Sequence, residues 1–188
     1  VRQGVLGFMA HELLSGDEQP PTSGNYGLGD LVTALKWVQL NIRHFGGDPG
    51  RVTLLGHRQG ASLATALTAV RAGDGLYSRV WASGGAARLG ELSLEQATEQ
   101  WGGVVKAVCG DRGRECLVEV EAEELLAQAG AGEPYWAQDN LPSKGERSMA
   151  GLLVVDSKLL SRRVVEVWAE TPVTLPVVLG KEQEILDI

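Results

Sequence analysis

The segment Gly56-His57-Arg58-Gln59-Gly60 has the spacing of the Gly-x-Ser-x-Gly turn, which presents a serine nucleophile between a strand and a helix. We expect both glycines to be required, because side chains at the flanking positions would collide with neighbouring backbone. At the central position stands Arg58, whose guanidinium stays protonated and has no lone pair that could attack a carbonyl carbon. The motif therefore predicts the shape of a nucleophile turn without its chemistry.

The elements around this turn alternate between helices and strands. Apolar spacing predicts helices over Gly27–His44 and Ala61–Val70, and short β-branched or apolar runs predict strands over Arg51–Leu55, closed by Gly56, and over Arg79–Ser83. Such alternation favours the α/β class, with a mainly parallel sheet that is covered by helices on both faces.

The rest of the chain gives shorter signals. The apolar runs Gly4–Met9 and Leu175–Gly180 predict two further buried strands. Between them, Gly16–Gly24 is rich in turn-forming residues and is expected on the surface. Beyond Leu92 the chain is expected to be helical, with an acidic run on a solvated face. The members of that run are Glu119, Glu121, Glu123 and Glu124.

The two cysteines, Cys109 and Cys116, flank a short polar loop that contains glycines. This spacing suits a local disulfide, but it also suits a pair of reduced thiols, and the number of cysteines leaves both open. A disulfide over so small a loop would add about 2 to 3 kcal/mol of stability by the chain-entropy model.

Composition excludes several classes of function. The net charge of −7 argues against a nucleic-acid surface, which needs a basic stripe. No phosphate-binding loop or dinucleotide motif occurs in the sequence, so no cofactor is expected. The three histidines, His11, His44 and His57, lack a second ligand at metal spacing, and we propose no metal site. No apolar run reaches the roughly 18 to 20 residues that cross a bilayer.

A long series of segments before the turn resembles the carboxylesterase and cholinesterase family. These segments are Gly24 to Leu28, Asp30, Ala34 to Gln39, Asn41-Ile42, Phe45 to Pro49 and Arg51 to Thr53, and Val154 to Asp156 follows later in the chain. The resemblance implies an α/β-hydrolase fold, of which residues 1–188 form the central part of one cholinesterase-like domain, incomplete at both ends. Cys109 and Cys116 fall where cholinesterases close a local disulfide, which implies an oxidising compartment.

The resemblance also implies where the catalytic parts of an active relative would be. The Gly-rich oxyanion loop would precede Val1, and the catalytic histidine would lie beyond Ile188. The acid would be Glu184, with Glu182 as a competitor, and the N–H of Gln59 would serve the oxyanion hole. We expect Arg58 either to fill the former active-site pocket and pair with Glu184, or to be tolerated without a role.

With arginine at its centre, the turn resembles that of the non-catalytic adhesion branch of the family. This likeness implies the ectodomain of a plasma-membrane glycoprotein that binds an extracellular protein, such as a secreted immunoglobulin-superfamily ligand. A membrane anchor would lie in the remainder of the protein. The exposed loops Gly16–Gly24 and Gly130–Gly145 could supply contacts, the second through Tyr135 and Trp136, although Trp136 could equally pack onto the rest of the domain.

Two other functions stay open. One is an active esterase that uses another nucleophile, for which Ser62 and Ser83 are the nearest serines in sequence. The other is an inactive relative that still holds a small ligand in the old active-site gorge. Asn25, Asn41 and Asn140 lack Ser or Thr two residues on, so these 188 residues contain no glycosylation acceptor.

Overall fold

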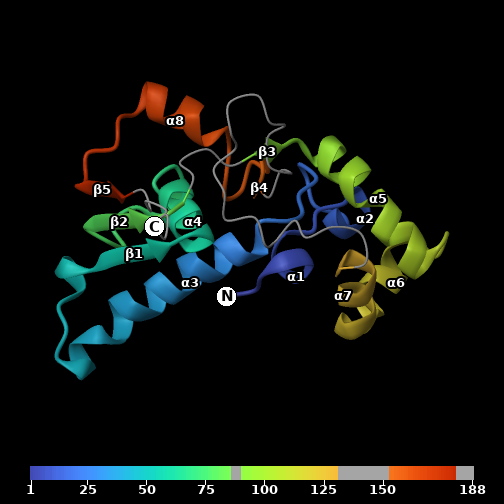
Figure 1. Cartoon of the computed structure of the whole chain (residues 1–188), viewed down its shortest axis with the longest axis horizontal. Coiled ribbons are helices and arrows are strands. Elements are labelled where there is room, and N and C mark those ends of the chain that lie inside the picture. Colours follow the sequence, from blue (N-terminus) through green and yellow to red (C-terminus); the bar gives the residue numbers. More distant parts are fainter. Residues whose placement is uncertain (86–89, 131–152, 181–188) are drawn as a thin grey trace, which may run out of the picture. The chain divides into compact units, whose positions relative to one another are not determined.

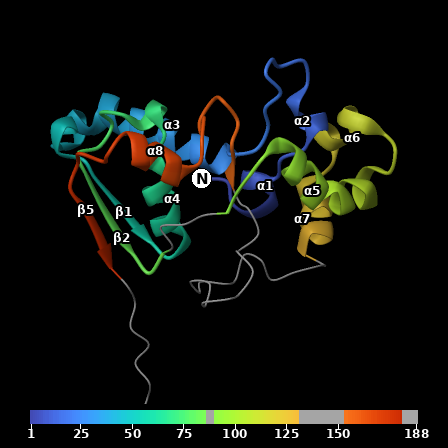
Figure 2. The ribbon, with the colours of Figure 1, turned by 90° about the horizontal axis from the view of Figure 1, so that it is seen from above.

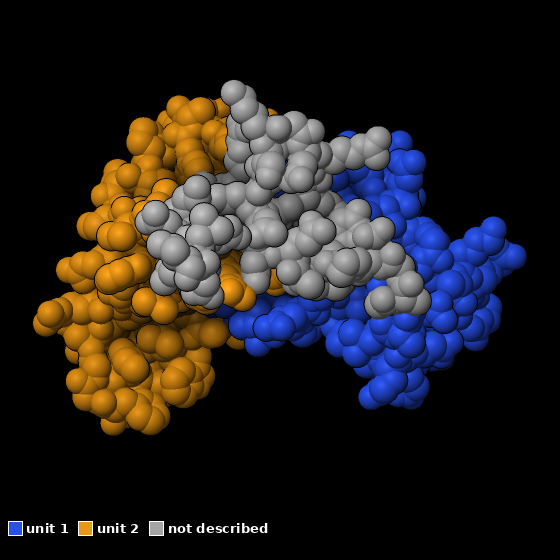
Figure 3. All heavy atoms as spheres, in the orientation of Figure 1, with its two compact units in different colours: residues 1–32, 89–138, 147–163 blue, residues 33–88, 139–146, 164–188 orange. Residues whose placement is uncertain are grey.

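The computed structural model describes residues 1–85, 90–130 and 153–180, which fall into two compact units (Figure 3). Unit 1 comprises residues 1–32, 89–138 and 147–163, and unit 2 comprises residues 33–88, 139–146 and 164–188. Two predictions fall outside the described residues: the acid Glu184 with its competitor Glu182, and the contact loop beyond Gly130 with Tyr135 and Trp136.

Unit 2 contains a sheet of three parallel strands in the order β1-β2-β5 (Figure 1). The strands are β1 (Thr53–His57), β2 (Arg79–Ser83) and β5 (Val177–Gly180). Their register places Trp81 between Leu55 on one neighbour and Val178 on the other. The α/β class and the parallel sheet are thus confirmed, and β2 has the predicted bounds.

Helices of unit 2 pack along this sheet. α4 (Gln59–Leu67) lies against β1 and β2, and Val80 and Ala82 of β2 are buried. α8 (Val164–Glu170) is tied to the end of α4, because the Trp168 indole N–H donates to the Thr68 hydroxyl at 2.8 Å. Single 3₁₀ turns occupy Ile42–Phe45, Pro49–Arg51 and Arg71–Gly73.

The helix predicted over Gly27–His44 is confirmed as α3 (Tyr26–Asn41) followed by the 3₁₀ turn Ile42–Phe45. It ends at Gly46, which adopts a left-handed φ of 77° and donates its N–H to the carbonyl of Arg43 at 3.1 Å. Glycine takes this conformation without a steric penalty, which explains why the helical chain stops there.

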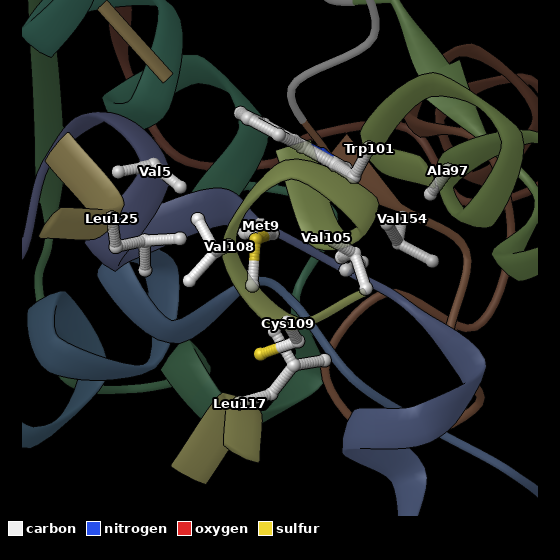
Figure 4. Packing of buried hydrophobic residues seen from close by; sticks show 11 residues of the cluster. Val5, Met9, Ala97, Trp101, Val105, Val108, Cys109, Leu117, Leu125 and Val154 are labelled. Atoms are coloured by element: carbon white, nitrogen blue, oxygen red, sulfur yellow. The ribbon is translucent and has the colours of Figure 1, made fainter. Parts of the chain in front are cut away.

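Unit 1 is mainly helical around an apolar core (Figure 4). Its elements are α1 (Gly4–Phe8), α2 (Glu12–Ser15), β3 (Glu91–Leu92), α5 (Leu94–Cys109), α6 (Gly113–Glu119), α7 (Ala122–Gly130) and β4 (Leu153–Val154), with β3 and β4 paired in parallel. α5 begins with a capping box in which Ser93 and Gln96 each bond the other's backbone N–H. Trp101, Val105 and Val108 of this helix line the core. The acidic run is exposed, as predicted.

The prediction of a strand over Gly4–Met9 is wrong, because this segment forms α1. Its buried side chains are Val5, Phe8 and Met9, which have the i, i+3, i+4 spacing of a helix face. Alternation with a period of two is missing from the segment, and a short apolar run alone does not separate a buried strand from a buried helix. The i, i+3, i+4 spacing of the apolar residues was the better predictor of the structure.

The strand predicted over Leu175–Gly180 exists as β5, but it is not buried. Val178 and Leu179 are more than half exposed. β5 has one hydrogen-bonded neighbour among the described strands, so no described strand packs beside its side chains on the other edge. A smaller correction concerns Gly56, which does not close β1, since the strand continues through it to His57.

Asn25 joins two distant segments of unit 1. It is fully buried, its amide donates to the carbonyl of Val154 at 2.6 Å, and its side-chain oxygen accepts from the N–H of the same residue at 3.0 Å. Asn25 also has a φ of 55°, a region that asparagine tolerates better than most residues. One side chain therefore satisfies both polar groups of a buried backbone position.

Asn25→Ala is expected to lower the free energy of unfolding by about 3 kcal/mol or more, since two buried backbone groups lose their partner and alanine resists the positive φ. Urea unfolding followed by circular dichroism measures this change. The matched control is Asn41→Ala, which removes an exposed bond to the Trp37 carbonyl and should cost under about 0.5 kcal/mol. Equal losses in the two variants would contradict the role given to Asn25.

His11 caps the start of α2, because its ring Nδ1 accepts from the N–H of Leu13 at 3.2 Å. Only an unprotonated Nδ1 can accept this bond. Burial is the main cause that lowers the pKa of His11 below its usual 6.5, and the carboxylate of Glu12 opposes this shift more weakly. The fold therefore favours the neutral imidazole.

Stability should accordingly be full above pH 6.5 and fall as the pH drops from there through the lowered pKa of His11, because protonation is less favourable in the folded chain. His11→Asn keeps an oxygen acceptor at the cap and should flatten this part of the pH profile of the melting temperature. His44→Asn, at an exposed position, is the control. An unchanged profile in His11→Asn would refute the assignment.

Candidate functional site

The predicted nucleophile turn is present at the end of the sheet. β1 ends at His57 and α4 begins at Gln59, so Arg58 alone connects strand to helix. Its backbone has φ 52° and ψ −119°, a region that residues with a Cβ rarely adopt, at a cost of about 1 to 3 kcal/mol. The predicted strand, turn and helix are present, and the central residue of the turn is strained.

Backbone hydrogen bonds hold Arg58 in this conformation. Its N–H donates to the carbonyl of Ser83 at the end of β2, at 2.8 Å. Its carbonyl accepts from the N–H groups of Ala61 and Ser62 in the first turn of α4, at 2.9 and 3.2 Å. All three bonds use the backbone of Arg58, so these bonds can form whichever side chain stands there.

The two glycines of the motif are not equivalent. A Cβ on Gly56 would lie 2.3 Å from the Gly60 carbonyl oxygen and 2.6 Å from the Ala61 Cα, so glycine is required at position 56. A Cβ on Gly60 would meet nothing within 4 Å among the described residues. The expectation that both flanking glycines avoid a collision is therefore right for Gly56 and wrong for Gly60, which sits inside α4 with its missing side chain toward open space.

A third glycine at the turn was missed by sequence reasoning. A Cβ on Gly85 would lie 2.4 Å from the Arg58 carbonyl oxygen and 2.6 Å from the Ala61 Cβ. The preceding Gly84 has a φ of 69° and donates its N–H to the Gly180 carbonyl at 2.9 Å. The paired glycines directly after the predicted strand Arg79–Ser83 were the available signal, since glycine after a strand often marks close backbone approach.

The side chains of the turn face outward. His57, Arg58 and Gln59 are exposed, and each makes further interactions. Glu184, the acid that the resemblance assigns, lies outside the described residues. The ion pair between Arg58 and Glu184 therefore stays a prediction, as does an oxyanion role for the Gln59 N–H.

Neither rival nucleophile occupies a comparable turn. Ser62 is buried within α4, where its N–H is part of the helix start. Ser83 is half-buried at the end of β2 and supplies its carbonyl to Arg58. Nucleophilic serines need an exposed hydroxyl with a base beside it, which the buried position of Ser62 does not provide.

The disulfide between Cys109 and Cys116 is confirmed, and it links the end of α5 to α6 with a Cα–Cα distance of 5.8 Å. The loop Gly16–Gly24 is exposed over Gly16–Pro21, while Ser23 and Gly24 are buried. The Ser23 hydroxyl anchors the end of this loop, because it accepts from the His11 N–H and donates to the His11 carbonyl.

Two searches of the described residues gave no candidate. No group of three or more His, Cys, Asp or Glu side chains with metal-binding geometry lies within residues 1–85, 90–130 and 153–180. None of the helices in the same ranges combines the length and the apolar character that a membrane span requires.

Comparison with known proteins agrees with this geometry. The model of the carboxylesterase family matches residues 1–185, and the chain belongs to that family. Neurotactin of Drosophila melanogaster is 40% identical over 172 residues, which are 89% of this chain and 20% of that protein. Human neuroligin-2 is 43% identical over 86 residues, which are 46% of this chain and 10% of neuroligin-2.

A solved carboxylesterase of Geobacillus stearothermophilus superposes with a TM-score of 0.76 and 31% identity, covering 96% of this chain and 35% of the enzyme. The expected likeness to neurotactin, suggested by Gly-His-Arg-Gln-Gly at the turn, and the α/β-hydrolase fold are both confirmed. The chain spans about a fifth of neurotactin and about a third of the enzyme.

Gly56→Ala is expected to destabilise the protein by about 3 kcal/mol or more, because the new Cβ must displace the backbone of the turn. Gly60→Ala is the matched control and should be neutral or stabilising by up to about 1 kcal/mol, since alanine favours a helix and meets open space. Thermal unfolding measures both variants. If both destabilise equally, the turn differs from the one described.

Proposed function

We propose that the chain belongs to a catalytically inactive cholinesterase-like domain that acts in heterophilic cell adhesion by binding an extracellular protein. The observation that carries the proposal is Arg58 in the nucleophile conformation of the turn. Loss of a serine nucleophile costs on the order of a million-fold in turnover, or about 8 kcal/mol of activation free energy. The guanidinium cannot substitute for the hydroxyl, since it offers no lone pair.

The adhesion role is supported by the likeness to neurotactin, which extends over nine-tenths of this chain, and by the shorter likeness to neuroligin-2. Both relatives belong to the adhesion branch of the family, which the sequence of the turn already indicated. By this likeness the domain lies in the ectodomain of a plasma-membrane protein whose anchor is elsewhere in the protein. The disulfide between Cys109 and Cys116 supports an oxidising compartment.

The partner of such a domain is an extracellular protein, and by the same likeness a secreted immunoglobulin-superfamily ligand. The exposed part of the loop Gly16–Gly24 is a candidate contact surface, since Gly16 to Pro21 are open to solvent. The loop is braced on one side by the ion pair between Glu18 and Lys158. A braced, exposed loop loses little conformational entropy when a partner binds.

An active esterase is the alternative that the family's enzymes suggest, and the Geobacillus carboxylesterase is one of them. The geometry disfavours it, because Ser62 is buried in a helix and Ser83 ends a strand. Retention of a small ligand by an inactive domain has no specific observation in its favour. A thermal-shift screen of small esters would detect such a ligand.

The proposal predicts the behaviour of cells that display the full-length protein. They should not react with a fluorophosphonate probe at this domain, whereas the Geobacillus carboxylesterase, as positive control, should. They should also bind cells that display an immunoglobulin-superfamily ligand, and Arg58→Ser should leave this binding within about twofold, because the turn holds any side chain by its backbone. Labelling of the unaltered domain would refute inactivity, and failure to bind any such ligand would refute the adhesion role.

A further inference from the structure

The C-terminal half of α3 and the 3₁₀ turn that follows it present a surface that is both aromatic and cationic. We call this surface the α3 stripe, and its members, all exposed, are Lys36, Trp37, Leu40, Arg43, His44 and Phe45. Trp37, Leu40 and Phe45, its apolar members, are 53%, 78% and 71% exposed. Figures 1 and 2 both show this end of α3 at the periphery of unit 2.

Helical spacing places the members of the stripe beside one another. Leu40 lies three positions after Trp37 and four after Lys36, so it neighbours both on the helix surface. Phe45 joins them from the 3₁₀ turn, because its ring centroid lies 5.9 Å from that of Trp37 at an interplanar angle of 45°. The apolar members therefore form one continuous patch.

This patch has the size of the apolar part of a protein–protein interface. On ordinary side-chain areas, the exposed fractions of its three members amount to about 400 Å². A standard interface buries about 800 Å² per partner, of which rather more than half, or about 450 Å², is apolar. Exposed patches of this size on a monomer are often functional.

The charge of the stripe differs in sign from that of the chain. Residues 31–47 include Lys36 and Arg43 but no Asp or Glu, whereas the whole chain has a net charge of −7. Within the part of the chain that the structure describes, neither cation forms an ion pair. Both charges are therefore available to carboxylates of a partner at the rim of the apolar patch.

Contacts within unit 2 order the stripe before a partner binds. The Gln39 side chain fastens α3 by donating to the carbonyls of Pro49 and Leu76, each at 2.8 Å. The contact between the rings of Trp37 and Phe45 restricts both side chains. A surface that is ordered in advance loses less conformational entropy on binding.

We infer that the α3 stripe is a surface by which the domain binds its extracellular protein partner, and that the partner presents an apolar anchor flanked by Asp or Glu. The inference rests on the proposed function in heterophilic adhesion, to which it adds a contact surface and the chemistry of the partner. Charge complementarity selects this partner, since its carboxylates would face Lys36 and Arg43 while its anchor packs on Leu40. The loop Gly16–Gly24 in unit 1 stays a separate candidate.

Two other occupants fit the stripe less well or must be separated by experiment. In a symmetric contact with a second copy, Lys36 and Arg43 of one chain would meet the same cationic face of the other, which is unfavourable. A phospholipid surface also binds aromatic and basic side chains of a helix, so lipid vesicles belong in the test.

Binding of a designed peptide to the full-length protein tests the inference. The probe is a fluorescent amphipathic helix with Leu and Phe on one face and Asp and Glu beside them, and fluorescence anisotropy measures its affinity. The double variant Lys36→Glu/Arg43→Glu should bind it about tenfold or more weakly, because two attractions become repulsions. Leu40→Asp should weaken binding to a similar extent, since the centre of the apolar patch is lost. The matched control is Arg71→Glu, at an exposed position of unit 2 outside the stripe, and it should stay within about twofold.

Several outcomes would overturn the inference. One is failure of the unaltered protein to bind the acidic peptide, and another is equal binding by the double variant. Vesicles of phosphatidylserine and phosphatidylcholine that bind the unaltered protein more tightly than the peptide does would assign the stripe to lipid. Self-association that the double variant abolishes would assign it to a second copy. A melting temperature of the double variant more than about 5 °C below that of the unaltered protein would mean that the same polypeptide covers the stripe.

Cell binding separates this inference from the proposed function. Cells that display the double variant should bind cells displaying an immunoglobulin-superfamily ligand about tenfold or more weakly than cells with the unaltered protein. Equal binding by the two would leave the adhesion role standing and overturn the role of the α3 stripe. If the unaltered protein binds no such ligand, the adhesion role fails, and the peptide result still decides whether the stripe takes an acidic partner.

Discussion

The backbone conformation of Arg58 is the constraint on which the sheet of unit 2 depends. One residue turns the chain from the end of β1 into the start of α4, and it does so at φ 52° and ψ −119°. A strained residue persists only where its surroundings determine it fully. Here the carbonyl of Ser83 and the N–H groups of Ala61 and Ser62 satisfy both backbone groups of Arg58, and Gly56 and Gly85 allow the close approach.

This arrangement separates the shape of the turn from its chemistry. Arg58 is held by hydrogen bonds of its backbone and by the close approach that Gly56 and Gly85 allow, whereas catalysis would require the side chain at the centre. A serine and an arginine pay a similar conformational cost there, because both carry a Cβ. The fold therefore accommodates the turn with an arginine at its centre, and a family resemblance at this motif does not by itself imply an activity.

Prediction from sequence succeeded where local pattern decides the structure. Periodicity and glycine spacing predicted the strand Arg79–Ser83, the long helix into Phe45 and the turn at Arg58. Some failures, such as the strand over Gly4–Met9, came from a local pattern that was misinterpreted, and others came from partners distant in sequence. Glycine is needed at position 85 because a Cβ there would collide with the carbonyl oxygen of Arg58, 27 positions earlier. Asn25 is held by two hydrogen bonds to the backbone of Val154. The exposure of β5 was unpredictable for the same reason, since burial depends on which neighbours a strand receives.

The turn differs in kind from one face of the sheet in unit 2, on which the exposed side chains of Leu55, Trp81 and Val178 stand side by side. The exposed residues of the turn, His57, Arg58 and Gln59, are polar. The surface of Leu55, Trp81 and Val178 is mainly apolar, with the indole N–H of Trp81 as its one polar group, so contact of this surface with water raises the free energy of the folded chain. A surface used for reversible adhesion must be stable in both its free and its bound state, and its rim is typically polar. The polar, exposed residues of the turn meet that requirement more closely than Leu55, Trp81 and Val178 do.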